Sequence, residues 1–272
     1  MTNASDDRVR IEQDIVFGTG GGRDLKCDLY VPPRQVADAP SVLLVHGGAW
    51  SGGDRGQLRG YGILLGRKGY VCVCCEYRLS GESKWPAQIE DAKAALRWMR
   101  ANSGDLRIDP AKITVSGNSA GAHIALMVGA TPNKPEFEGS GGNAGVSTDV
   151  AAVIGIYAPT DLGRPTNASG GAVSALMGPD ADESAYRAGS PVDYARADFP
   201  PTLLIHGNKD TTVPVAASLR MHSALLEAGA AVELHTFNGA PHAFDGASDY
   251  GRLCAEIMAV FMERHVVRTS AG

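Results

Sequence analysis

The chain has 272 residues, of which 44% are hydrophobic, and this length and composition fit one packed domain of the alternating strand and helix kind. Its formal charge of −5 gives no electrostatic basis for binding nucleic acid or an anionic membrane. No stretch of the sequence reaches the roughly 18 apolar residues of a membrane span. We therefore expect neither a nucleic-acid partner nor a membrane.

The cysteines and the first residues indicate a reducing compartment. Residues 1–10 are polar and acidic, without the apolar core of a signal peptide. The five cysteines are an odd number, and Cys72, Cys74 and Cys75 fall in one predicted strand, where neighbours cannot bridge one another. We expect reduced, buried thiols in a cytoplasmic protein. A metal site at these three cysteines is the alternative, and it is disfavoured because no histidine lies at ligand spacing.

The first predicted elements form a β-hairpin at the edge of a sheet. Residues 9–18 and 25–31 alternate apolar and polar side chains, and the glycine-rich segment 18–22 separates them. From Ser41 onward, predicted strands and helices alternate, which implies right-handed crossovers and a parallel sheet. Residues 89–99 have helical spacing, because their apolar side chains repeat every three or four positions.

Two later segments lack a regular pattern. Residues 131–148 and 158–200 are rich in Gly, Pro, Ala, Asp and Asn, and the second follows a predicted strand at 150–157. We interpret both as loops with short helices over the mouth of the site. Residues 1–272 are therefore expected to form a single domain with a cap-like insertion at about 158–200.

The most informative motif is Gly117-Asn118-Ser119-Ala120-Gly121. It follows the apolar run 111–116 and opens onto residues 123–128, which have the character of a helix. A strand that feeds a helix through Gly-x-Ser-x-Gly is a nucleophile elbow, which exposes a strained serine above the sheet edge. The helix beginning at Ala120 directs its free N–H groups at the position where an oxyanion would form.

A second motif, His46-Gly47-Gly48-Ala49-Trp50, follows the predicted buried strand 41–45. A His-Gly-Gly loop in this place supplies backbone N–H groups to the oxyanion hole of esterases. We expect Gly48 and Ala49 to contribute them. Trp50 is open to two interpretations, lining the substrate pocket or packing in the core.

The remaining catalytic candidates end later predicted strands. Asp210 lies three residues beyond a strand ending in His206-Gly207, and His242 lies in a Gly- and Pro-flanked loop after the last strand. Ser119 needs a base because a hydroxyl is hardly ionised at neutral pH, and histidine can accept a proton and return it. The chain order Ser119, Asp210, His242 is the order of the α/β-hydrolase scaffold. Asp161 is the alternative acid.

On these motifs the chain resembles carboxylesterases of the α/β-hydrolase superfamily, nearest the hormone-sensitive-lipase-like branch and its small bacterial acetyl and feruloyl esterase relatives. The matching stretches run from about residue 40 to 245 and are His46–Trp50, Glu76–Leu79, Trp85–Ala87, Glu90-Asp91, Asp109-Pro110, Gly117–Gly121, His206-Gly207, Asp210, Val213 and Gly239–Phe244. The sequence departs from the family at two positions. Ala49 replaces the usual third glycine of the oxyanion loop, which leaves its N–H in place. Asn118 stands before the nucleophile where the lipase-like branch usually carries an acid.

The resemblance implies an α/β-hydrolase fold with a mostly parallel eight-stranded sheet, helices on both faces and a small cap. It implies a serine carboxylesterase that acts on small-molecule, short-chain esters without metal or organic cofactor, as a monomer or homodimer. Catalysis would use Ser119, His242 and Asp210. Carbohydrate acetyl or feruloyl ester hydrolysis, and amide hydrolysis of the arylformamidase or peptidase type, are the alternatives.

Other polar residues are assigned to the scaffold. His46 is expected to tie the oxyanion loop in place, His123 to pack one helical turn past the serine, and His206 to support the acid loop. Arg78 and Asp91 resemble a buried or half-buried scaffold pair, although the sequence alone does not show them in contact.

Overall fold

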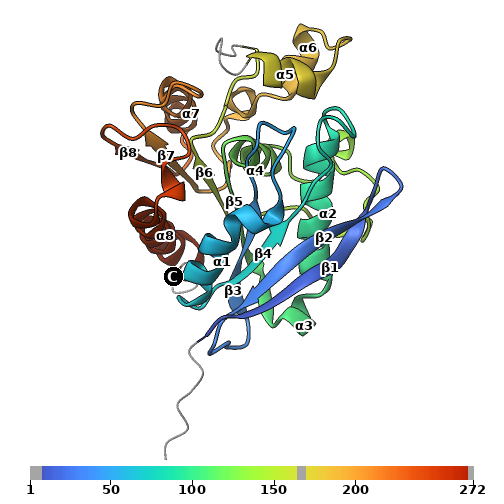
Figure 1. The fold of residues 1–272 in the computed structure, drawn as a ribbon, viewed down its shortest axis with the longest axis vertical. Coiled ribbons are helices and arrows are strands. Elements are labelled where there is room, and N and C mark those ends of the chain that lie inside the picture. Colours follow the sequence, from blue (N-terminus) through green and yellow to red (C-terminus); the bar gives the residue numbers. More distant parts are fainter. Residues whose placement is uncertain (1–7, 164–169, 269–272) are drawn as a thin grey trace, which may run out of the picture.

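A computed structural model describes residues 8–163 and 170–268. Within these ranges eight strands form one sheet in the order β1-β2-β4-β3-β5-β6-β7-β8 (Figure 1). The strands are β1 (Arg10–Gly20), β2 (Arg23–Val31), β3 (Ala39–Val45), β4 (Val71–Cys75), β5 (Ile108–Asn118), β6 (Ala152–Ile156), β7 (Thr202–Gly207) and β8 (Val232–Phe237).

All neighbouring pairs are parallel except those made by β2, which runs antiparallel to both β1 and β4. The mostly parallel eight-stranded sheet predicted from the sequence is therefore confirmed. The edge hairpin is also present, but its strands are longer than predicted. Only Gly21 and Gly22 form the turn, because Thr19 still pairs with Asp24 and its N–H donates to the carbonyl of Gly141 at 3.0 Å.

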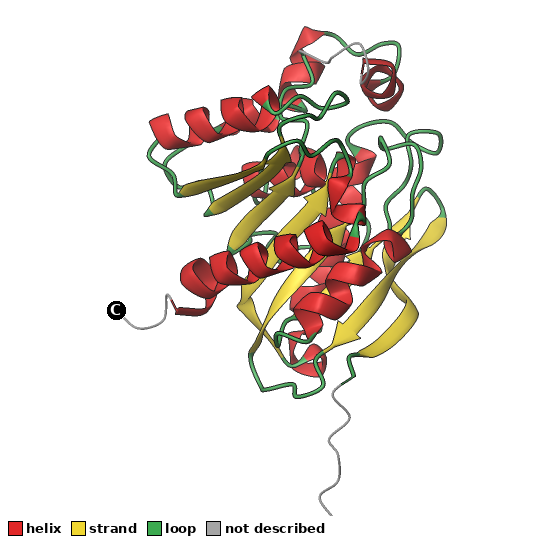
Figure 2. Ribbon diagram, turned by 60° about the vertical axis from the view of Figure 1, so that its left-hand side comes forward, coloured by secondary structure: helices red, strands yellow, loops and turns green. Residues whose placement is uncertain are grey.

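Helices cover both faces of the sheet (Figure 2). Helices α1 (Arg59–Gly66) and α8 (Ser248–Met262) pack over one face, and α2 (Ala87–Ala101), α4 (Ala120–Ala130) and α7 (Ala216–Glu227) over the other. Because side chains alternate along a strand, each strand contributes to both faces. On β3, Val42 and Leu44 pack in the core under α1 and α8, and Leu43 and Val45 pack in the core under α2, α4 and α7.

No helix in the described part of the chain is long and apolar enough to cross a membrane. The predicted helix at 89–99 lies within α2, whose N-terminal end is tied to the chain after β4. Arg78 there donates through Nε and Nη2 to the two carboxylate oxygens of Asp91, each at 2.8 Å, so the predicted scaffold pair exists.

The segment predicted to be a cap-like insertion contains short helices. Between β6 and β7 lie α5 (Gly170–Met177), α6 (Glu183–Ala188) and the 3₁₀ helix η3 (Pro191–Tyr194), while residues 164–169 fall outside the described residues. Figure 1 shows α5 and α6 together at one end of the molecule. Hydrogen bonds attach this segment to the body and to itself; for example, the N–H of Trp85 donates to the carbonyl of Leu176 at 3.0 Å, and the N–H of Leu162 to Oγ of Ser190 at 2.8 Å.

The five cysteines are buried free thiols. Cys72 and Cys74 face α1 and α8, whereas Cys75 faces the opposite cluster, as alternation along β4 requires. Cys75 lies directly opposite Cys27 across the β2–β4 pair, a cross-strand neighbour that the sequence did not indicate. Burial raises the pKa of each thiol, that of Cys27 to about 12.

Candidate active site

The candidate site lies at the carboxyl edge of the parallel strands. The His46–Trp50 loop follows β3, Ser119 follows β5, Asp210 lies in the loop after β7, and His242 lies in the loop after β8. Because parallel strands end at one edge of a sheet, four separate parts of the sequence meet there.

Ser119 sits at the tight turn between β5 and α4, with φ 51° and ψ −118°. A non-glycine residue with positive φ is strained and persists only where its surroundings hold it. Its N–H donates to the carbonyl of Ile156 at 2.9 Å. At Gly121, a Cβ atom would lie 2.0 Å from the carbonyl oxygen of Val45, so only glycine allows α4 to start this close to β3. The elbow predicted from the sequence therefore forms.

Ser119, His242 and Asp210 form one hydrogen-bonded chain. Oγ of Ser119 lies 2.9 Å from Nε2 of His242, and Nδ1 of His242 lies 2.6 Å from Oδ2 of Asp210. With the ring proton on Nδ1, facing the carboxylate, Nε2 is free to accept from the hydroxyl. The carboxylate that contacts His242 in the described structure is that of Asp210.

The carboxylate of Asp210 is fully buried but well supplied with donors. Its Oδ1 accepts from the N–H groups of Thr212 and Val213, at 2.9 and 2.8 Å. Burial alone would raise the pKa of Asp210. The hydrogen bonds from His206, His242 and the Val213 N–H outweigh it, and hold that pKa well below its usual range. Asp210 is thus fixed as an anion.

His206 supports the acid loop, as the sequence indicated. Its Nε2 lies 2.8 Å from the carbonyl oxygen of Val213 and 3.3 Å from Oδ2 of Asp210, and its Nδ1 lies 2.7 Å from Oγ of Ser218. A buried histidine with partners at both ring nitrogens fixes the loop against α7.

Hydrogen bonds also join the acid loop to the histidine loop. The N–H of Lys209 donates to the carbonyl of Ala240 at 3.0 Å, and Oδ1 of Asn208 accepts from the N–H of Gly239 at 2.7 Å. The two loops that carry Asp210 and His242 are therefore positioned as one unit.

The loop after β3 turns at Gly48, whose carbonyl accepts from the N–H groups of Ser51 and Gly52. Gly48 has φ 115°, and a Cβ there would lie 2.2 Å from the Gly52 oxygen, so the position requires glycine. Within the described ranges, the N–H groups of Gly48 and Ala49 donate to no backbone carbonyl. The first amides of a helix, such as that of Ala120 in α4, likewise have no acceptor within the helix.

His46 fastens this loop to the body of the protein. Its ring stacks on Tyr77 with centroids 4.3 Å apart, its Nδ1 lies 2.7 Å from the carbonyl oxygen of Gly47, and its own carbonyl accepts from the Tyr77 hydroxyl at 3.1 Å. The predicted structural role of His46 agrees with this arrangement.

His123 connects the His46–Trp50 loop to the segment between β6 and β7. Its Nδ1 accepts from Nε1 of Trp50 at 3.3 Å, so the ring proton is on Nε2, which donates to the carbonyl of Gly189 at 2.7 Å. Burial lowers the pKa of His123 to about 4, although the bond to Gly189 opposes the shift. Trp50 is 2% exposed, so of its two interpretations the structure supports core packing.

Tyr157 and Asp245 are site residues that the sequence reasoning missed. The ring of Tyr157 lies 4.7 Å from that of His242, and its hydroxyl bonds to both Asn118 and Asp245. A signal existed, because Tyr157 directly follows β6 at the edge where the other site residues lie, and Asp245 is three residues past His242.

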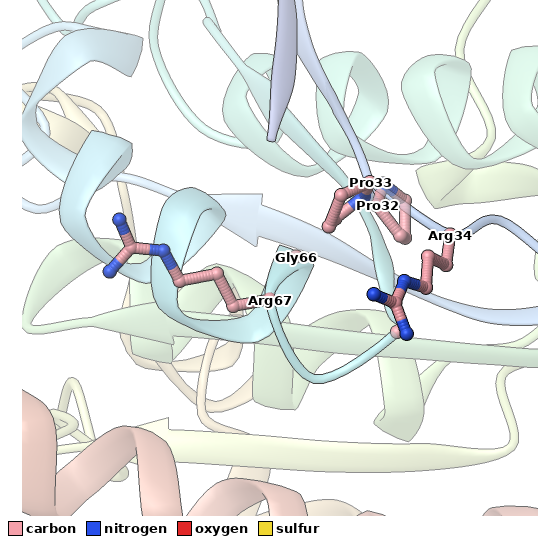
Figure 3. A pocket seen from close by; sticks show the side chains of 6 residues that line it. Pro32, Pro33, Arg34, Gly66 and Arg67 are labelled. Carbon is pink, nitrogen blue, oxygen red and sulfur yellow. The ribbon is translucent and has the colours of Figure 1, made fainter. Parts of the chain in front are cut away.

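A cavity of about 360 Å³ adjoins the nucleophile elbow. Its lining includes Asn118, Leu58, Tyr61, Leu64, Asp245 and Arg252. A larger pocket of about 530 Å³ lies between Pro32, Pro33, Gly66 and Arg67, where β2 ends and the parallel strands begin. Figure 3 shows the guanidinium groups of Arg34 and Arg67 there extending in different directions. Neither pocket is lined by Ser119, Asp210 or His242.

No three His, Cys, Asp or Glu side chains of residues 8–163 and 170–268 converge as metal ligands would.

Comparison with known protein families identifies the family of this chain. The family model described as BD-FAE matches residues 27–225, which include Ser119 and Asp210, and the chain belongs to this family. The resemblance identified from the sequence motifs is confirmed.

A similar curated protein is the esterase LipQ of Mycobacterium tuberculosis, which is 34% identical over 265 residues. The match covers 92% of this chain, but the chain spans only 61% of LipQ.

Solved esterase structures share the fold. Esterase 2 of Thermogutta terrifontis, phosphonylated by sarin, superposes with a TM-score of 0.84 at 25% identity, covering 97% of this chain and 96% of that one. The same esterase has been solved with propionate bound and with butyrate bound. A truncated carbohydrate esterase from gut microbiota superposes with a TM-score of 0.85 at 24% identity, covering 97% and 99%, and shows the α/β-hydrolase fold alone.

Proposed function

We propose that the protein is a serine carboxylesterase that hydrolyses short-chain acyl esters through Ser119, His242 and Asp210. One observation carries the proposal: the 2.9 Å and 2.6 Å contacts that join the serine hydroxyl, the imidazole and the buried carboxylate in a single line. Names given to relatives, such as esterase for LipQ, support the same chemistry.

Acylation begins when Oγ of Ser119 attacks the ester carbonyl while Nε2 of His242 takes the hydroxyl proton. The imidazolium formed is stabilised by Asp210, which stays ionised because its pKa lies well below its usual range. The oxyanion of the tetrahedral intermediate accepts from the N–H of Ala120 and from those of Gly48 and Ala49. Each preorganised donor of this kind contributes roughly 3 kcal/mol of transition-state stabilisation.

Collapse of the intermediate breaks the bond to the alcohol, which takes the proton from His242 and leaves an acyl group on Ser119. Water then attacks the acyl-enzyme, giving its proton to His242, and the acid is released as the proton returns to Ser119. No step requires a metal or an organic cofactor.

The segment between β6 and β7 favours short acyl groups over long ones. The cap supplies no broad apolar face, because its large apolar side chains Leu162, Val173, Leu176, Met177 and Phe199 are buried in the described structure. A true lipase needs such a face to dock on lipid. The propionate and butyrate complexes of the Thermogutta esterase support the same preference.

The test is a series of p-nitrophenyl esters from acetate to palmitate, assayed below and above micelle formation. We expect the highest kcat/KM between acetate and about hexanoate, without a jump at the interface. A maximum at the longest chains, or activation at the interface, would contradict the esterase assignment in favour of a lipase. Acetylated sugars, methyl ferulate and an aryl formamide serve as further substrates, and faster hydrolysis of one of them would replace the simple ester as substrate.

We further propose that the protein works in the cytoplasm, because five unpaired buried thiols suit a reducing compartment. The monomer or homodimer expected from the resemblance is to be measured by sedimentation.

A further inference from the structure

Tyr157 occupies a strained position beside the proposed catalytic histidine. It follows β6 with φ 42°, a left-handed conformation that is unusual for a bulky side chain. Its N–H donates to the carbonyl of Ile205 at 2.7 Å, and the residue is 1% exposed. Such strain persists only where several contacts hold the residue, and it clusters at functional sites.

The contacts that hold Tyr157 belong to the site. Its ring lies 4.7 Å from that of His242 and 5.5 Å from that of Phe244. Its hydroxyl accepts from Nδ2 of Asn118 at 3.1 Å and donates to Oδ1 of Asp245. Asn118 precedes Ser119 and Asp245 follows His242 by three residues, so one phenol joins the nucleophile elbow to the histidine loop.

The direction of these hydrogen bonds is fixed by a single proton. Burial, and then the charge of Asp245, raise the pKa of Tyr157 well above its usual range, so the phenol keeps its proton. The phenol donates this proton in a hydrogen bond to Oδ1 of Asp245, whose Oδ2 accepts from the Tyr61 hydroxyl at 2.9 Å. Residue 118 must therefore be a donor.

Asn118 meets this requirement and a carboxylate would not. Its Nδ2 faces the phenol, while its Oδ1 is buried without a partner among the described residues. A buried acceptor without a partner is unfavourable and cannot itself favour this orientation. The orientation of the amide is therefore decided by the hydrogen bond from Nδ2 to Tyr157. This accounts for Asn118 at a position where the resembling branch usually carries an acid: here the carboxylate of Asp245 already accepts from the same phenol hydroxyl.

We propose that Tyr157 is a positioning residue that fixes His242 against Ser119, and that Asn118 and Asp245 set the direction of its hydrogen bonds. The inference rests on the proposed function, because it assigns Tyr157 to the same serine and histidine. Asp210 holds one edge of the imidazole, and Tyr157 holds the ring from a second side.

The first test compares two phenols that share the carboxylate of Asp245. Tyr157→Phe keeps the ring on His242 but removes the link to Asn118, and we expect kcat on p-nitrophenyl butyrate to fall roughly 10- to 100-fold with KM within about twofold. Tyr61→Phe is the matched control, since Tyr61 bonds Asp245 without a ring contact to His242. We expect its kcat to fall at most a few-fold. Equal kcat values in the two variants would overturn the proposal.

The second test exchanges donor and acceptor. Asn118→Asp leaves two carboxylates to share one phenol proton, and we expect kcat to fall roughly 10- to 100-fold. In Asn118→Asp/Asp245→Asn the phenol donates to position 118 and accepts from position 245, and kcat should return to within a few-fold of wild type. Lack of recovery in a folded double variant would contradict the assigned direction.

Thermal unfolding of the wild type, Asn118→Asp and the double variant keeps the two proposals distinguishable. The Tm of Asn118→Asp should fall and that of the double variant should recover, whatever reaction the protein catalyses. Hydrolysis of p-nitrophenyl butyrate by the wild type tests the proposed function separately. If Tm recovers but the wild type hydrolyses no ester, the proposed function fails and the hydrogen-bond direction stands. If Tm does not recover, the direction is wrong.

Discussion

Two hydrogen-bonded clusters flank Ser119 in the sequence, through Asn118 before it and His123 after it, and they are built differently. One consists of Asn118, Tyr157 and Asp245 and contains a carboxylate. The other consists of Trp50, His123 and Gly189 and contains only neutral groups, because burial keeps the His123 imidazole uncharged. Each includes one bulky aromatic residue in the left-handed region, Tyr157 at φ 42° and Trp50 at φ 56°.

The difference shows two ways of fixing the direction of hydrogen bonds, one in a half-buried cluster and one in a fully buried cluster. In the first cluster the carboxylate of Asp245, which can only accept, receives the hydrogen bond from the Tyr157 hydroxyl. In the second, Trp50 can only donate, which places the His123 proton on Nε2 toward the cap. The first arrangement depends on charge and the second on the histidine staying neutral, so the two should respond differently to substitution and to acid.

The largest effect is expected at the two proposed catalytic residues Ser119 and His242, which belong to neither cluster. Ser119→Ala removes the nucleophile and His242→Ala removes its base, and each should lower kcat/KM by roughly 10⁴-fold or more. The double variant should lose no more than the worse single one, because the two residues act as a unit. The measurement is p-nitrophenyl butyrate hydrolysis with folding checked by circular dichroism. Near-wild-type activity of Ser119→Ala would require a different nucleophile.

Asp210→Asn should cost less than His242→Ala, because the amide keeps the shape of the loop but loses the charge that orients and stabilises the imidazole. Asp161→Asn is the control, with expected activity close to wild type. If Asp161→Asn lowers kcat more than Asp210→Asn does, the acid has been assigned to the wrong residue.

Acid should destabilise the protein through the neutral cluster. The pKa of His123 is about 4 in the folded protein, against about 6.5 when unfolded, so the unfolded chain binds the proton first. The contribution of neutral His123 to the free energy of unfolding is fully present above pH 6.5. It should decrease by about 3 kcal/mol as the pH falls to about 4. Asp210 adds little to the pH dependence in this window, because its pKa is lowered in the folded protein. Its stabilisation is present above the usual pKa range of a carboxyl group and is lost as the pH falls below that range.

The check is urea unfolding of wild type and His123→Gln between pH 4 and 7. The variant should show a flatter dependence of the free energy of unfolding on pH than the wild type does. Equal slopes for wild type and His123→Gln would contradict the assignment. Burial also lowers the pKa of His46, which acts in the same direction in both proteins and cancels in the comparison.

The smallest effect is expected for the cysteines, which belong to neither cluster. Iodoacetamide should leave the activity of the folded protein unchanged, because the thiols are buried and their pKa values are raised. The urea-unfolded chain is the control and should react. Loss of activity in parallel with labelling of the folded protein would place a thiol at the site.

The sequence predicted what depends on one segment at a time. The elbow at Ser119 and the strand ends before Asp210 and His242 are visible because each motif combines a local apolar pattern with small residues. The parallel sheet follows from the alternation of strands and helices, and in such a sheet these segments must meet.

Contacts between loops could not be predicted in this way. The role of Tyr157 depends on Asn118 and Asp245, which lie 39 and 88 positions away in the sequence. Cys27 and Cys75 become neighbours only through the register of β2 on β4. The exact turn of the hairpin depends on Gly141, a residue from a distant loop.

The most direct test of the central claim is covalent labelling by a fluorophosphonate, with the adduct located by mass spectrometry. We expect one phosphonyl group per chain on the peptide that contains Ser119, no adduct on Ser119→Ala, and strongly slowed labelling of His242→Ala. An adduct on another residue, or equal labelling of wild type and Ser119→Ala, would contradict the account.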